Sequence, residues 1–169
     1  MVTSAIFFAF IVVAQPLTAA DQKKITFESY GLARIGMSRA DLQRVVGSKL
    51  KNDYADADTE GCEYVSSAKG YSGVSFMIID QRVARIDVTS PTVSTLSGIR
   101  IGSSQSLVLS TYPGRITITD HAYTGPEGKY LTMHSTDNKY GIRFETDGER
   151  VASYYAGTPE AIQYIEGCL

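Results

Sequence analysis

One stretch of this chain occurs twice, and this duplication constrains the fold more than any other feature. Residues 31–38, GLARIGMS, return in modified form as residues 98–104, GIRIGSS. A second pair of stretches, 73–84 and 141–152, follows in the same order, and in both of them Phe lies three residues and Val ten residues after Gly. Similar stretches in one order indicate a duplicated structural unit.

Each copy is followed by residues that favour a short helix. Ser38 and Asp41 fit a capping box, in which the Ser hydroxyl accepts a backbone N–H and the carboxylate returns to the cap. Gly47 is a natural C-terminal stop for this helix. In the second copy Ser104 caps a helix that ends at residues 113–114, Pro-Gly. From their spacing we expect Leu42, Val45 and Val46 of the first helix to face inward. In the second helix we expect the same of Leu107, Val108 and either Thr111 or Tyr112.

The segments after each helix alternate apolar and polar residues between turn signals, which predicts half-buried strands. The expected strands cover 63–66, 74–79 and 82–88 in the first copy and 116–120, 130–134, 141–145 and 150–155 in the second, and 25–28 also fits a strand. The expected fold class is α+β, with two tandem repeats, each a short helix packed on an antiparallel sheet of three to four strands. The first repeat would span 21–90 and the second, with a C-terminal tail, 98–169, joined at 91–97.

Residues 1–20 are predicted to be a signal peptide. They contain no charged side chain, residues 5–14 form an apolar run, and Thr18-Ala19-Ala20 offers small residues for cleavage. The missing Lys or Arg before the apolar run counts against this interpretation. The run is shorter than the roughly 20 apolar residues of a membrane span, so the mature chain is expected to lack one. Cleavage near Ala20 would place the protein in the periplasm or outside the cell.

The chain has two cysteines, Cys62 and Cys168, one in each expected repeat. In an exported chain an isolated pair more often forms a disulfide than a metal site. The alternative is two reduced, buried thiols. The net charge of −2, without basic runs, argues against nucleic acid as a partner and gives no reason to expect binding to an anionic membrane surface.

The segment 53–60 is the closest approach to a metal site. Asp56, Asp58 and Glu60 imitate the first positions of a calcium loop, but Ser67 stands where the bidentate Glu should be. We therefore interpret the segment as a solvated acidic loop and expect neither a metal nor another cofactor.

The two histidines, His121 and His134, give little support to catalysis. Asp120 precedes His121, yet neighbours on a strand point to opposite faces, so this carboxylate would not orient the ring. A secreted hydrolase that uses His121 with a distant carboxylate stays open as an alternative function.

Tyrosine is the surplus residue, with eleven Tyr and no Trp in the chain. Tyr provides rigid amphipathic contact area and is favoured in recognition surfaces, although any single Tyr can simply fill the core. The candidate contact residues, all on expected strands, are Tyr130, His134, Arg143, Tyr154 and Tyr155. Because neighbours face opposite sides, we expect at least one of Tyr154 and Tyr155 to be available to a partner.

The pattern Ile35-Gly36-Met37-Ser38, with Asp41-Leu42 and the residues 45–47, Val-Val-Gly, resembles two known families. These are the small outer-membrane lipoprotein A type unit and the repeats of the β-lactamase inhibitor protein fold. The resemblance implies a continuous sheet surface that can grip a protein partner. The lipid-bearing Cys of the former and the disulfides within repeats of the latter are not encoded here, so no functional residues carry over.

These observations predict an exported, non-enzymatic binding module that recognises or inhibits a protein partner through its sheet face and loops. The alternatives are the hydrolase and a structural or assembly component of the cell envelope.

Overall fold

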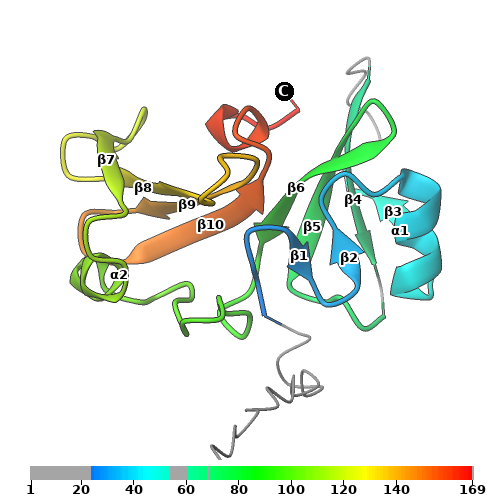
Figure 1. The fold of residues 1–169 in the computed structure, drawn as a ribbon, viewed down its shortest axis with the longest axis horizontal. Helices are drawn as coiled ribbons and strands as arrows, with labels where there is room; N and C mark the ends of the chain where they lie inside the picture. Colours follow the sequence, from blue (N-terminus) through cyan, green and yellow to red (C-terminus); the bar gives the residue numbers. More distant parts are fainter. Residues whose placement is uncertain (1–23, 54–60, 68, 169) are drawn as a thin grey trace, which may run out of the picture.

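The structure, a computed structural model, describes residues 24–53, 61–67 and 69–168. Over these residues a single antiparallel sheet of eight strands dominates the chain, in the order β3-β4-β5-β6-β10-β9-β8-β7 (Figure 1). β6 and β10 lie at its centre and join the N-terminal strands to the C-terminal strands. A separate two-stranded hairpin, β1 and β2, lies beside the N-terminal half.

The strands are short and follow the alternating segments of the sequence. They are β1 (Ser29–Tyr30), β2 (Ala33–Arg34), β3 (Leu50–Asn52), β4 (Cys62–Ser67), β5 (Val74–Ile79), β6 (Arg82–Val88), β7 (Thr117–Asp120), β8 (Lys129–His134), β9 (Gly141–Thr146) and β10 (Val151–Gly157). The helices are α1 (Arg39–Val46) and α2 (Gln105–Thr111), with a 3-10 turn η2 (Ala161–Gln163) near the C-terminus. The expected strands 74–79 and 82–88 are confirmed to the residue, whereas 25–28 contributes only an isolated bridge at Ile25.

The fold class expected from the sequence is wrong. Among the described residues strand predominates over helix, and eight of the ten strands form one continuous sheet rather than two helix-on-sheet repeats. The physical reason is the pairing of β6 with β10, in which Tyr155 lies opposite Asp87 and Tyr154 opposite Val88. This pairing hides the two strand edges that separate repeats would expose. The repeat boundaries 21–90, 91–97 and 98–169 stay a prediction.

One face of the sheet carries the main apolar core. Phe76 on β5, Ile86 on β6, Tyr154 on β10 and Phe144 on β9 are fully buried there and belong to one cluster that crosses the middle of the sheet. Side chains from both helices and from the β1–β2 hairpin complete it. Burial of apolar area on this scale is the main stabilising contribution to such a fold.

The starts of the helices follow the expected capping pattern. The Ser38 hydroxyl accepts the N–H of Asp41, and the Ser104 hydroxyl accepts the N–H of Leu107. Gly47 ends α1 with a φ of 67°, a conformation that glycine adopts without strain. Asp41 does not return to the backbone of the cap, because its carboxylate accepts the Ser38 hydroxyl instead, at 2.7 Å. The inward orientation expected for Leu107 is wrong, since this side chain is about half exposed.

The C-terminal residues cross the opposite face of the sheet. After β10 the chain turns through η2 and reaches β4, where the Cys62–Cys168 disulfide closes a separation of 106 residues. Figure 1 shows this segment, in red, lying over the junction of the two halves of the sheet. The disulfide expected from the sequence is confirmed. Such bonds persist in oxidising compartments, so the protein is an exported one.

Candidate functional site

The sheet face opposite the main core carries charged and aromatic side chains, and we call it the polar face. From one half of the sheet to the other it presents Tyr64 (β4), Arg85 and Asp87 (β6), Tyr155 (β10), Arg143 and Glu145 (β9), and Tyr130 (β8). Register sets them side by side, because Tyr155 pairs with both Asp87 and Arg143. The C-terminal segment covers part of this face, which is why Arg85 and Arg143 are buried and Asp87 and Glu145 are only partly exposed.

Cations and rings alternate across the polar face. The Arg85 guanidinium carbon lies 4.2 Å from the centre of the Tyr155 ring, and that of Arg143 lies 4.9 Å from the centre of the Tyr130 ring. The His121 ring stacks on the Tyr130 ring, with 4.5 Å between the two ring centres. Desolvated cation–π contacts of this kind contribute about 2 kcal/mol.

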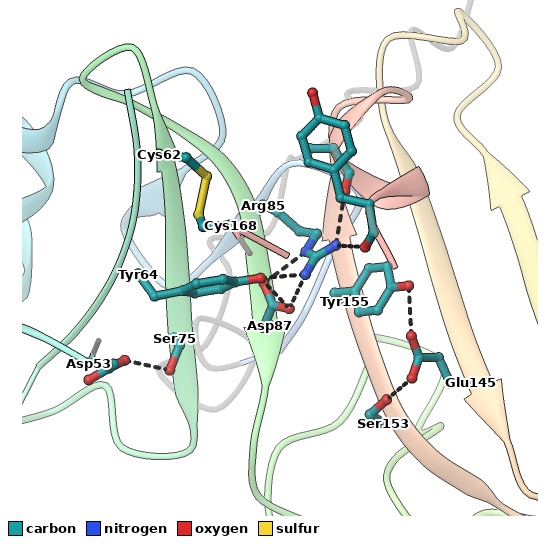
Figure 2. A network of polar contacts seen from close by, with 12 residues as sticks. Asp53, Cys62, Tyr64, Ser75, Arg85, Asp87, Glu145, Ser153, Tyr155 and Cys168 are labelled. Atoms are coloured by element: carbon teal, nitrogen blue, oxygen red, sulfur yellow. Dashed lines mark hydrogen bonds and ion pairs between the residues drawn. A yellow bond between two sulfur atoms is a disulfide. The ribbon is translucent and has the colours of Figure 1, made fainter. Parts of the chain in front are cut away.

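Arg85 is the centre of the hydrogen-bond network (Figure 2). Its side chain is only 4% exposed. Its Nε donates to Oδ2 of Asp87 at 3.0 Å, and its Nη2 forms an ion pair with Oδ1 at 2.9 Å. It also donates to the hydroxyl of Tyr64 and to the carbonyls of Ala161 and Tyr164, at 2.9 and 2.8 Å. A guanidinium has five N–H donors, so this arrangement satisfies a charge that would otherwise be costly to bury.

The electrostatics of this network follow from burial. Burial raises the pKa of Asp87, and the neighbouring Arg85 acts in the opposite direction. Burial is the main cause that raises the pKa of Tyr64 well above its usual range, and repulsion from the Asp87 carboxylate is the second cause. Tyr64 therefore stays protonated at neutral pH and acts as a hydroxyl, not as a phenolate.

A second group of contacts surrounds Glu145 on β9. Its carboxylate accepts the hydroxyl of Tyr155 at 2.9 Å and that of Ser153 at 2.8 Å, as Figure 2 shows. His121 Nε2 lies 3.6 Å from the same carboxylate. His121 Nδ1 accepts the backbone N–H groups of Tyr123 and Thr124, which assigns the proton of a neutral ring to Nε2. Burial is the main cause that raises the pKa of Tyr155, and the Glu145 carboxylate is the second. The Tyr155 hydroxyl therefore also stays protonated.

A cavity of about 350 Å³ lies on the polar face between these two groups. Its floor comes from strands β3, β4, β5, β6, β9 and β10, and one wall comes from residues 165–168 at the C-terminus. Tyr64, Arg85, Asp87, Glu145, Ser153 and Tyr155 all line it. Its volume is within the range of sites that hold a small molecule or a single inserted side chain.

The lining of the cavity carries more negative than positive charge. Its charged residues are Arg85 and the carboxylates Asp53, Glu63, Asp87, Glu145 and Glu166. Glu63 is paired with Arg39 at 2.7 Å, and Asp87 is paired with Arg85. The other three accept hydroxyl groups from Ser, Tyr or both, and no Lys or Arg among the described residues forms an ion pair with them. A concave site with this charge attracts cations.

The structure places four of the five candidate contact residues on the polar face. Tyr130, Arg143 and Tyr155 are buried there, and His134 lies at the end of β8 on the same face. Tyr154 points into the main core, fully buried, and donates its hydroxyl to the carbonyl of Val93 at 3.1 Å. Of the five, Tyr154 and Tyr155 line the cavity. Both are buried, so neither is available on an open surface as expected.

Sequence reasoning did not select Arg85, Asp87 and Glu145, which line the cavity. Arg85-Ile86-Asp87 and Arg143-Phe144-Glu145 share one pattern, a cation and a carboxylate flanking a fully buried apolar residue on a strand. Two charges at alternate positions of an apolar strand indicate a face that is covered but polar. This pattern was the feature of the sequence that could have identified these residues.

Two predictions fall on residues outside the described ranges. Residues 1–20, the expected signal peptide, and 54–60, most of the acidic segment, lie outside the described residues. Among the residues that are described, no three His, Cys, Asp or Glu side chains are grouped as a metal site would require, and no helix is long and apolar enough to cross a membrane.

Comparisons with known proteins identify relatives of the fold alone. No protein-family model matches the chain, and no curated protein matches it. An extracellular protein containing an SCP domain, from Bacillus anthracis str. Ames, superposes with a TM-score of 0.50 at 13% identity over 91% of this chain. This chain spans about half, 52%, of that structure. The uncharacterised protein YfeY from Escherichia coli aligns over 80% of this chain and 97% of its own length, at 12% identity and a TM-score of 0.44. Neither structure is described as one of the two families that the sequence resembles, so that resemblance stays a prediction.

Proposed function

We propose that this chain is an exported, non-enzymatic binding module that holds a protein partner at the cavity of the polar face. A basic side chain of the partner would enter the cavity and lie against the carboxylates. The observation that carries this proposal is the cavity itself, about 350 Å³ in volume, in which three lining carboxylates form no ion pair with Lys or Arg among the described residues.

The geometry around His121 supports binding more than hydrolysis. The Ser153 hydroxyl donates to Glu145 and not to a nitrogen of His121. His121 Nδ1 already accepts two backbone N–H groups, and Nε2 faces the carboxylate. A nucleophile has to contact its general base, and this arrangement instead joins both groups to one acid.

Photo-crosslinking in the native host tests the proposal. Ile165 at the cavity and Leu107 on α2 have equal exposure, 47% each, so a benzophenone amino acid at either position samples solvent similarly. We expect one defined protein to crosslink from position 165 and not from position 107. Glu145→Gln should lower the yield about tenfold, which corresponds to about 1.4 kcal/mol of binding free energy. Glu149→Gln, an exposed carboxylate outside the cavity, is the matched control.

Equal crosslinking from both positions, or an unchanged yield with Glu145→Gln, would contradict the proposal. So would the absence of any protein adduct together with strong stabilisation of the fold by a small molecule. Export through residues 1–20 is tested separately, since the mature protein should begin at Asp21 by mass spectrometry.

A further inference from the structure

The C-terminal segment is anchored in two different ways along its length. Residues 158–164 are held by the body of the protein: the N–H of Thr158 donates to the carbonyl of Ala84 at 2.9 Å, and Ile162 is fully buried. Arg85 also donates to the carbonyls of Ala161 and Tyr164. This part would stay in place without the disulfide.

Residues 165–168, which we call the flap, are held much less by the body of the protein. Within the described residues, none of the four forms a backbone–backbone hydrogen bond, and Ile165 and Glu166 are exposed. The flap contacts the rest of the protein through a hydrogen bond from the Tyr123 hydroxyl to Glu166 and through packing of Gly167 on the Tyr64 ring. Cys168 is bonded to Cys62 and is buried in an apolar cluster with Met77 and Ala84. The disulfide is the covalent anchor of the flap, and it holds Cys168 in this cluster.

The flap is also a wall of the cavity. All four of its residues line the cavity, and so does Cys62 on β4. Movement of the flap about Tyr164 would remove one wall and leave the floor unchanged, because the floor belongs to the sheet. The disulfide itself borders the cavity, because Cys62 and Cys168 both line it.

We propose that the Cys62–Cys168 disulfide is a site of thiol–disulfide exchange whose reduction releases the flap and opens the cavity. The co-reactant is a dithiol reductant. One of its thiolates attacks a sulfur of the disulfide and forms a mixed disulfide, and the other protein sulfur leaves as a thiolate. The second thiol of the reductant then displaces the protein. The protein disulfide gains two electrons and two protons, and the dithiol becomes a disulfide. The opening itself does not depend on the partner proposed above.

Limited proteolysis with a glutamate-specific protease tests the inference on the full chain. Glu166 lies in the flap, and Glu160 lies in the part held by Arg85 and Ile162, so the chain carries its own control. We expect brief treatment with dithiothreitol to raise the rate of cleavage after Glu166 at least tenfold and to leave cleavage after Glu160 unchanged. The products are separated after acid quench and full reduction, so that the disulfide does not hide the cut.

Two outcomes would overturn the proposal. Equal cleavage after Glu166 before and after reduction would mean that the disulfide does not hold the flap. Cleavage after Glu160 and Glu149 rising in parallel with Glu166, with loss of the tyrosine near-ultraviolet circular dichroism, would mean that the bond serves only to hold the whole fold. The Cys62→Ser/Cys168→Ser variant repeats the measurement at equilibrium, and early time points after reduction answer the question if that variant does not fold. Failure of the crosslinking experiment leaves this result intact, because no partner is used.

Discussion

Arg85 and Asp87 lie two residues apart on β6 and form a bidentate ion pair along a single strand. The guanidinium Nε lies 3.0 Å from Oδ2 and Nη2 lies 2.9 Å from Oδ1. Because neighbours alternate between faces, both side chains project onto the polar face while Ile86 enters the main core. The same guanidinium bonds the carbonyls of the C-terminal segment. A single arginine thus connects the strand, the carboxylate at the cavity and the chain that covers it.

Removal of this arginine is expected to destabilise the protein strongly. Arg85→Met retains much of the apolar volume but leaves the buried carboxylate of Asp87 and two backbone carbonyls without their donor. Breaking a buried pair from one side costs about 3 to 5 kcal/mol. Urea unfolding, with the slope compared between variants, measures the free energy of unfolding.

The double variant Arg85→Met/Asp87→Leu separates the cost of the unpaired charge from the loss of packing. Replacing both partners by apolar residues should recover most of the stability lost in the single variant. If the single variant loses less than about 1 kcal/mol, a value typical of exposed pairs, the pair is not the buried anchor described here.

The two serine caps should contribute similarly to stability. Ser38→Ala and Ser104→Ala each remove the acceptor for an N–H in the first turn of a short helix, and each should cost about 1 kcal/mol. Ser110→Ala is the control, because this exposed hydroxyl bonds the carbonyl of Leu107 within α2 and its loss should be nearly neutral. Chemical denaturation checks all three.

Loss of the Ser38 hydroxyl should also change the pKa of Asp41. The Ser38 hydroxyl is the largest cause of the lowered pKa of Asp41. Ser38→Ala should therefore raise that pKa toward its usual value, as followed by a nuclear magnetic resonance titration. An unchanged pKa would exclude the hydroxyl–carboxylate bond.

Local elements of the fold could be predicted from the sequence, and their assembly could not. The strands 74–79 and 82–88 and the caps at Ser38 and Ser104 depend on neighbours in sequence, so alternation and capping rules find them. The pairing of β6 with β10 depends on strands far apart in the chain. The duplicated stretches favoured two separate units, and nothing local indicated that their central strands would merge into one sheet.

The residues of the site could not be predicted from the sequence for a related reason. Tyr154 and Tyr155 were expected to include one accessible ring, because they face opposite sides of a strand. The expectation fails because both faces of β10 are covered, one by the main core and the other by the C-terminal segment. Arg85, Asp87 and Glu145 would ordinarily be assigned to the surface, as most charged residues are. Their burial depends on that same cover.

The turn between β8 and β9 is expected to weaken in acid. The pKa of Asp137 is lowered to about 2, mainly by the hydroxyl of Ser135, which donates at 2.7 Å, with help from Lys139. Because the folded pKa lies below the unfolded one, this contribution to stability is present above the unfolded pKa of about 4. It is lost as the pH falls from about 4 toward 2.

With Asp137→Asn, the free energy of unfolding should fall less steeply as the pH drops from about 4 toward 2. Urea midpoints at a series of pH values measure it, and Asp120→Asn, an exposed carboxylate on β7, is the comparison. A titration of the Asp137 carboxyl with a midpoint near 4 in the folded protein would contradict the hydrogen bonding at this turn.

The adjacent tyrosines of β10 offer a test of the two faces with one chemical change. Tyr154→Phe removes the donor to the buried carbonyl of Val93, and an unsatisfied buried acceptor costs about 1 to 3 kcal/mol. Tyr155→Phe retains the ring over Arg85 but removes a hydroxyl from Glu145, a charged acceptor that keeps the hydroxyl of Ser153. We expect both variants to be less stable, but only Tyr155→Phe to lower crosslinking from position 165, because only its hydroxyl orients a carboxylate of the cavity. Equal effects of the two changes on crosslinking would show that the cavity responds to general loss of stability, and its assignment as the binding site would then be wrong.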